Sequence, residues 1–210
     1  NVTENYIEDF FGIKLTETVT GQTHDIQVSE NIMDLSNGGT AGLSSSAAGI
    51  LVQGGWNIGI THNDIYEAPD DGIQVSYDPT GSGANNIQIE DNFIYRSAVA
   101  VSGQEGIQIV SDGMFPVTNI KAKDNDIVNP SIGIRVRFAT NAVYSDLELS
   151  NNKINGALSY GISLLGQNSK VNNNEIDNAG TYGILVEGLN GATREGIIEA
   201  SGNIIKDNSP

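Results

Sequence analysis

The chain has 210 residues, of which 38% are hydrophobic and 17% charged, so its size and composition suit one globular domain rather than a disordered segment. Its formal net charge of −16 argues against nucleic acid as a partner, because phosphate binding needs a basic surface. The absence of cysteine excludes a disulfide scaffold, a cysteine-ligated metal and a thiol nucleophile.

The chain has no obvious membrane or targeting segment. No apolar run approaches the roughly 18 residues that a membrane-spanning helix needs. The sequence begins with Asn1 rather than Met and carries no visible signal peptide, so we expect a fragment or mature part of a longer protein. An acidic surface is typical of secreted proteins, and we therefore expect an extracellular domain, either secreted or at the cell surface.

Two short patterns alternate strictly from one end of the chain to the other. In the first pattern, apolar residues lie three positions before and two positions after a recurring asparagine. These asparagines are Asn5, Asn31, Asn63, Asn92, Asn125, Asn152, Asn174 and Asn203. The second pattern is Gly-Ile-x-(Val/Leu/Ile), and its glycines are Gly12, Gly49, Gly72, Gly106, Gly133, Gly161 and Gly183. Together the patterns make seven full repeats and a final partial one.

Each repeat predicts three short strands. Alternation with a period of two residues indicates strands with one buried face, and no segment has a long helical stripe. Three strands separated by turns form one coil of a solenoid, in which each strand lies parallel to its copy about 4.8 Å away. We therefore predict one all-β domain over residues 1–210, a single-stranded parallel solenoid of about eight coils with three short strands each.

The alternating patterns resemble those of the right-handed parallel β-helix superfamily, which includes pectate lyases, alginate lyases and epimerases, polygalacturonases and phage tailspikes. The resemblance implies that Gly-Ile-x-Val is the first strand of each coil, and that the asparagine lies at the turn between the second and third strands. We expect the asparagine to adopt a left-handed turn and its amide to bond to its copies in neighbouring coils. In the polysaccharide-active relatives, the substrate groove follows the outer face of the first strands.

The outer face of the predicted first strands carries the most site-like residues. Two connections, 34–48 and 95–105, are longer than their counterparts in other coils. Outward positions in the second to fifth coils include four polar candidates for substrate binding and two basic candidates for catalysis. The former are Gln53, Gln74, Ser76 and Gln108, and the latter are Arg135 and Arg137. An arginine can clamp the carboxylate of a uronic acid, or it can pair with the many acidic neighbours.

A second candidate region is EAPDDGIQVSYDPTGSG, residues 67–83. Asp70 and Asp71 precede a first strand and are candidate Ca²⁺ ligands, because carboxylate oxygens suit that ion, which is the only cofactor we expect. Tyr77 and Asp78 follow the strand and are candidate proton-transfer residues, although Asp, Pro and Gly also simply form turns. The single tryptophan, Trp56, either stacks on a sugar or covers an edge of the core.

Two functions remain open at this point. The first is binding of an acidic polysaccharide, with lyase, epimerase or hydrolase chemistry as a further hypothesis. The second is a non-catalytic solenoid such as an adhesin, stalk, tail fibre or filament subunit, which would associate end to end or as a trimer. The Asp-Pro-His motif of the alginate epimerases is not matched, because Asp78 and Pro79 are followed by Thr80. The sequence therefore leaves open whether the domain is an enzyme.

Overall fold

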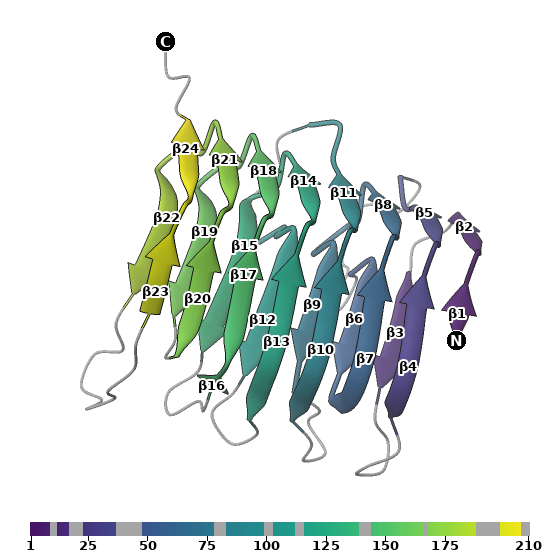
Figure 1. Cartoon of the computed structure of the whole chain (residues 1–210). Helices are drawn as coiled ribbons and strands as arrows, with labels where there is room; N and C mark the ends of the chain where they lie inside the picture. The colour runs from purple at the N-terminus through teal and green to yellow at the C-terminus, as the bar shows by residue number, and fades with distance from the viewer. Residues whose placement is uncertain are drawn as a thin grey trace.

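The structure is a computed structural model that describes residues 1–8, 12–16, 23–36, 48–77, 83–98, 103–111, 116–138, 144–165, 168–187 and 198–206. These ranges contain 24 strands and no helix. Accordingly, no helix in them has the length and hydropathy of a membrane span. The strands follow one another as successive coils of a single solenoid (Figure 1).

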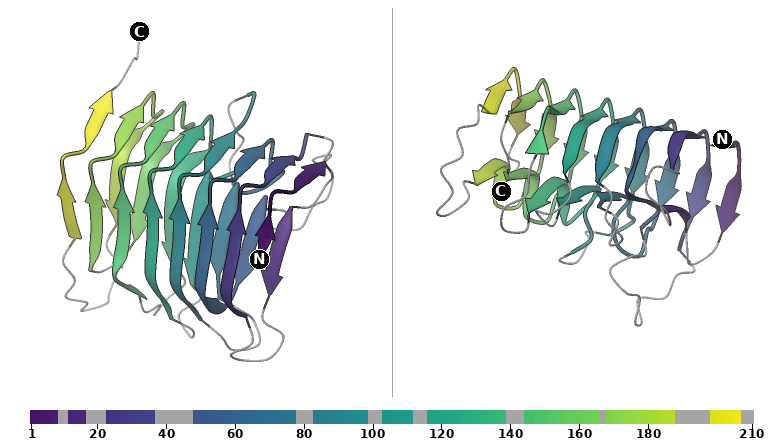
Figure 2. Two further views of the ribbon diagram at one scale, coloured as in Figure 1. Left: turned by 45° about the vertical axis from the view of Figure 1, so that its right-hand side comes forward. Right: turned by 90° about the horizontal axis from the view of Figure 1, so that it is seen from below.

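The strands form three parallel sheets, which we name after the position of their strands in each coil (Figure 2). The first sheet contains β3 (Ile13–Thr16), β6 (Ile50–Gln53), β9 (Ile73–Ser76), β12 (Ile107–Ser111), β15 (Ile132–Phe138), β19 (Tyr160–Leu165) and β22 (Tyr182–Glu187). The second sheet contains β1 (Val2–Thr3), β4 (His24–Ser29), β7 (Gly55–Thr61), β10 (Ala84–Glu90), β13 (Val117–Lys123), β17 (Leu147–Ser150), β20 (Ser169–Asn172) and β23 (Ile198–Ser201), with β16 (Tyr144–Ser145) paired to β13. The third sheet contains β2 (Tyr6–Glu8), β5 (Ile32–Asp34), β8 (Asp64–Tyr66), β11 (Phe93–Tyr95), β14 (Asp126–Val128), β18 (Lys153–Asn155), β21 (Glu175–Asp177) and β24 (Ile204–Lys206). The predicted architecture of about eight coils with three strands each is confirmed.

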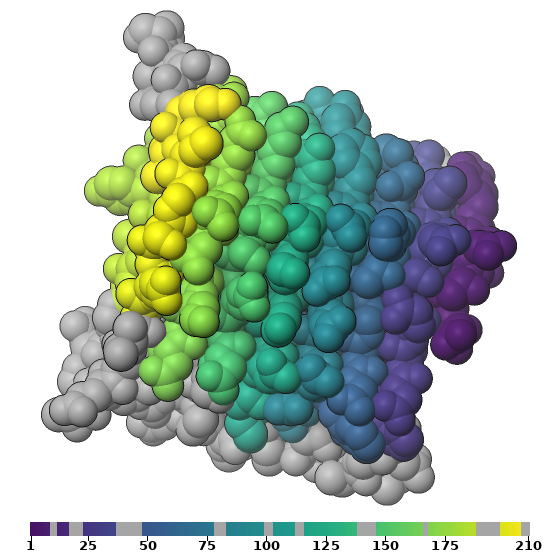
Figure 3. Space-filling view, in the orientation of Figure 1, coloured from purple at the N-terminus to yellow at the C-terminus, as the bar shows by residue number. Residues whose placement is uncertain are grey.

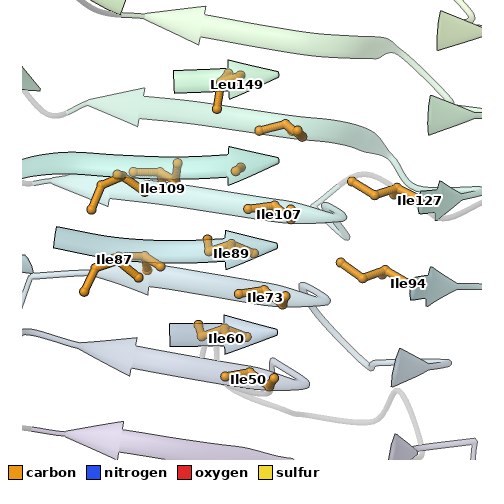
Figure 4. Packing of buried hydrophobic residues seen from close by; sticks show 14 of the residues in the cluster. Ile50, Ile60, Ile73, Ile87, Ile89, Ile94, Ile107, Ile109, Ile127 and Leu149 are labelled. Atoms are coloured by element: carbon orange, nitrogen blue, oxygen red, sulfur yellow. The ribbon is translucent and has the colours of Figure 1, made fainter. Parts of the chain in front are cut away.

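The core is a column of aliphatic side chains inside the three sheets. Strand pairing places equivalent residues of successive coils side by side, as with Ile60 and Ile89 in the second sheet. Figure 4 shows Ile94 and Ile127 extending from the third sheet toward the strands of the other two. These four side chains are buried. Branched aliphatic side chains pack well on a pleated surface, so stacking of identical coils fills the interior.

The recurring asparagines form the predicted ladder. The Nδ2 atom of each donates to the Oδ1 atom of the next, at 2.8–3.0 Å along the whole series. The left-handed conformation, however, lies one residue earlier than predicted. It is adopted, with φ between 54° and 65°, by Glu4, Glu30, His62, Asp91, Asp124, Asn151, Asn173 and Gly202. The turn thus points the preceding side chain outward, while the asparagine amide turns inward to bond along the ladder.

The glycines that precede the first strands are required mainly for space. A Cβ atom on Gly72 would lie 2.5 Å from Cγ2 of Ile94 and 2.6 Å from the carbonyl oxygen of Gly106. The same crowding by the next coil recurs at Gly106, Gly133 and Gly161. A side chain at these corners would push successive coils apart, so close stacking of coils explains the second sequence pattern.

Candidate functional site

Three predicted site residues form a row on the outer face of the first sheet. Gln74 on β9, Gln108 on β12 and Arg135 on β15 occupy equivalent positions in neighbouring strands. The Nε2 atom of Gln74 donates to Oε1 of Gln108 at 3.0 Å. The nearest row along the strands holds Gln53 and Ser76, which are also direct neighbours. The register of the sheet therefore brings the predicted substrate-binding residues together.

Arg137 lies apart from the other polar members of its row. Val110 on β12 separates it from Ser76 on β9. Several outward positions are also more enclosed than we expected, since Gln108 and Ser76 are each 7% exposed. In a tightly stacked sheet, each short outward side chain is flanked by its copies 4.8 Å away, which shields it from solvent.

Beneath the row lies a buried pair of carboxyl groups. Asp71 and Glu105 occupy equivalent positions, each directly before the glycine that leads into β9 or β12, and each is only 1% exposed. The main-chain N–H of Glu105 donates to Oδ1 of Asp71 at 3.0 Å, and the two carboxyl groups are hydrogen-bonded to each other. The charge of Glu105 therefore opposes ionisation of Asp71.

The pKa values of the two carboxyl groups are shifted in opposite directions. Burial, followed by the hydrogen bond and the charge of Glu105, raises the pKa of Asp71 well above its usual value. Burial also opposes ionisation of Glu105, but hydrogen bonds from Asp71 and Arg135 and the charge of Arg135 outweigh it and lower the pKa of Glu105. These directions favour Glu105 as the ionised member of the pair and Asp71 as the protonated one.

Two arginines surround this pair. The Arg135 NH1 atom donates to Oε1 of Glu105 at 2.6 Å, while Nε2 of Gln108 donates to Oε2 at 3.2 Å. The Glu105 side chain is fully buried, but that of Arg135 keeps 32% of its surface exposed. Arg96 is nearly buried and donates through NH2 to the main-chain oxygen of Asp70. Glu105 therefore fixes the orientation of Arg135 from below and leaves part of its guanidinium to solvent.

The residues predicted to bind metal and transfer protons are placed as follows. Asp70 is half-buried, and burial together with the charge of Glu105 raises its pKa, against the opposing charge of Arg96. Asp71 turns to Glu105, and among the described residues no group of three His, Asp or Glu side chains could hold a metal ion. Tyr77 follows β9 and is partly exposed, whereas Asp78 lies outside the described residues. The Ca²⁺ site remains a prediction.

Sequence reasoning missed Glu105 and Arg96 as parts of this site. A signal for Glu105 was present, because the residue before the first-strand glycine is Ala48 or Ile132 in the flanking coils but acidic at Asp71 and Glu105. Arg96 has no counterpart in a repeated pattern. Its role depends on its burial beside Asp70, which the sequence does not reveal.

The arrangement offers a partly exposed cation beside a row of planar amides. A guanidinium held by a buried carboxylate is pre-organised, so it loses little conformational entropy when a second acceptor binds to its remaining N–H groups. The amides of Gln74 and Gln108 can bond hydroxyl groups in the same row. These are the chemical requirements for an anionic, hydroxylated ligand.

Fold and site together define a parallel β-helix solenoid with a polar patch on its first sheet. The family model for the right handed beta helix region matches residues 48–210, and the chain belongs to this family. A search of curated proteins found no match.

Proposed function

We propose that the domain binds an acidic polysaccharide along the outer face of β9, β12 and β15. Arg135 would pair with a uronate carboxylate, and the amides of Gln74 and Gln108 would bond hydroxyl groups of adjoining sugars. Such polymers are found outside cells, so the proposal places the domain there.

The observation that carries this proposal is the ion pair of Arg135 with the fully buried Glu105. Burying carboxyl groups is expensive, and the corresponding corners of the neighbouring coils are filled by Ala48 and Ile132 at no such cost. The repeat is therefore broken where a polar row lies on the surface. Departures of this kind from local regularity concentrate at functional sites.

Retention on immobilised polygalacturonate and alginate tests the proposal. Arg135→Ala should weaken binding by about tenfold or more, because it removes a charge-assisted hydrogen bond to the carboxylate. Arg135→Lys should fall between this variant and the wild type, since lysine keeps the charge but loses the planar fork. Lys153→Ala, which removes an exposed cation from the third sheet, is the matched control and should bind as the wild type does.

Loss of Arg135 also leaves the buried Glu105 without its cationic partner, so unfolding midpoints must be measured in parallel. Gln74→Ala removes only a neutral amide and should weaken binding about threefold with an unchanged fold. If both Arg135→Ala and Gln74→Ala bind like the wild type, the proposed site is wrong. Absorbance of unsaturated uronate in the same mixtures tests lyase chemistry separately.

The alternative function, a non-catalytic stacking solenoid, is best tested at the exposed apolar side chains around β24. Ile205 on β24 occupies the same register position as the buried Ile176, yet it is 53% exposed. Tyr182 and Ile204 in the same region are also exposed. Sedimentation velocity tests this alternative: Ile205→Lys should lower any self-association, whereas Trp56→Lys, at an exposed position on the side of the solenoid, should not.

A further inference from the structure

The outer face of the second sheet, which faces the viewer in Figure 3, carries a further ordered array of polar side chains. Asn57 and Asn86 adopt left-handed conformations within β7 and β10, with φ of 55° and 53°. Asn57 Nδ2 donates to Oδ1 of Asp25 at 2.9 Å, and Asn86 Nδ2 donates to Oδ1 of Asn57 at 2.7 Å. Asn119 continues the chain with a 2.9 Å bond to Asn86. These four residues form an outer ladder on the surface.

The left-handed residue makes two consecutive side chains point outward, as in a β-bulge. Trp56 and Asn57 are therefore both exposed, and the next residue, Ile58, returns to the core. Trp56 stacks on His24 of the preceding coil, with ring centroids 4.5 Å apart and planes inclined by 18°. Trp56 is 40% exposed, so part of its indole is open to solvent.

One face of the indole is available beside the outer ladder. His24 covers the other face, and the register places the shorter side chain of Asn85 on the open side. An asparagine extends less far from the sheet than an indole, which leaves the outer part of the ring uncovered. Because the stack with His24 restrains Trp56, binding on this face costs little side-chain entropy.

A depression lies next to Trp56 along the same strands. Gly59 and the Gln27 side chain both line it, and the Gln27 amide lies over Gly59, since a Cβ atom at Gly59 would lie 2.2 Å from Oε1 of Gln27. The polar groups that line it are Asp25, Asn57, Asn86, Gln27 and Gln88. Gln27 is held by a 2.7 Å bond to Thr61, whereas the Gln88 amide has no hydrogen-bond partner among the described residues. Gln88 is thus a free donor and acceptor at the rim.

We propose that this surface is a second binding site, specific for a neutral pyranose unit of a polysaccharide. The apolar face of the sugar would lie on the indole of Trp56, and its hydroxyl groups would bond to Gln88 and to the outer ladder. Among the residues that the structure describes, Asp25 is the only charged side chain that lines the depression, so a uronate would be repelled. The site is therefore complementary in specificity to the Arg135 site on the first sheet and does not depend on it.

The single tryptophan of the chain makes a direct test simple, because tryptophan emission reports only on Trp56. The purified protein is titrated with cellohexaose, maltohexaose, mannohexaose and xylohexaose, and with oligogalacturonate as the acidic probe. At least one neutral hexasaccharide should change the emission saturably, and oligogalacturonate should not. If no neutral hexasaccharide does so, or if oligogalacturonate binds equally well, the proposal is wrong.

Variants then locate the binding. Gln88→Ala, at an exposed position without a partner among the described residues, should raise the dissociation constant about fivefold. Gly59→Ala should raise it about tenfold, because its Cβ atom would displace the Gln27 side chain that lines the depression. Trp56→Ala should abolish the heat of binding in calorimetry. Lys170→Ala, in the same outward row of the second sheet, is the control and should match the wild type. If Gln88→Ala and Gly59→Ala both bind with the dissociation constant of the wild type, the proposal is wrong, whatever the outcome at Arg135.

Discussion

Replacement of Asn92 by alanine should destabilise the solenoid more than most surface or loop changes. Asn92 is 1% exposed, and its Nδ2 atom donates to the carbonyl oxygens of Ile60 and Glu90 at 2.9 and 3.0 Å and to Asn125. Its Oδ1 atom accepts from the main-chain N and from Nδ2 of Asn63, at 3.1 and 2.9 Å. Alanine leaves these buried groups unpaired and opens a small cavity.

The expected loss in the free energy of unfolding is about 4 kcal/mol, from unpaired groups that each cost about 1–3 kcal/mol and from the cavity. For a denaturant slope of about 3 kcal/mol/M, the urea midpoint, followed by far-UV circular dichroism, should fall by about 1.3 M. Asn203→Ala is the matched control, because Asn203 ends the ladder and is only half-buried. Water can replace its bonds, so about 1 kcal/mol is expected. Equal midpoints for the two variants would refute the view that the buried ladder stabilises the stack of coils.

Three further outcomes are expected. Asp71→Asn keeps a donor to Glu105 but removes the titratable proton. Because the pKa of Asp71 is raised in the folded protein, the wild type should lose stability relative to this variant as the pH rises from 3.8 toward the folded pKa. Urea titrations at stepped pH measure this difference, and the opposite trend would contradict the raised pKa of Asp71. Gly106→Ala should cost about 2–3 kcal/mol in the same titration, since its Cβ would lie 2.5 Å from Cγ2 of Ile127, and a neutral effect would show that the coils can separate freely. Lys121→Ala breaks an exposed 3.7 Å pair with Glu148, so thermal unfolding should reveal a change below about 1 kcal/mol; a larger loss would mean that the outer charges of the second sheet stabilise the coils.

The candidate site on the first sheet could be predicted only in part. The row of Gln74, Gln108 and Arg135 followed from the repeat, because equivalent positions in a stacked solenoid must be neighbours. The sequence left open whether Arg135 pairs with an acidic neighbour, and such an ion pair, with Glu105, is present. In the sequence, however, Glu105 is marked only as the last residue of a long connection. Glu105 and Arg135 are 30 residues apart in the sequence, and they meet only because the corners of neighbouring coils lie side by side. No local sequence pattern carries that information.

The sequence by itself determined the fold of this protein. A repeated alternation of apolar residues, with an asparagine and a glycine at constant places, can bury its apolar face only by stacking one coil on the next. Tertiary structure alone decided the chemistry of the surface. It raised the pKa of Asp71, oriented Arg135 through Glu105, and stacked Trp56 on His24. Burial, pKa values and ring contacts depend on side chains from different coils, so they arise only once the register has aligned those coils.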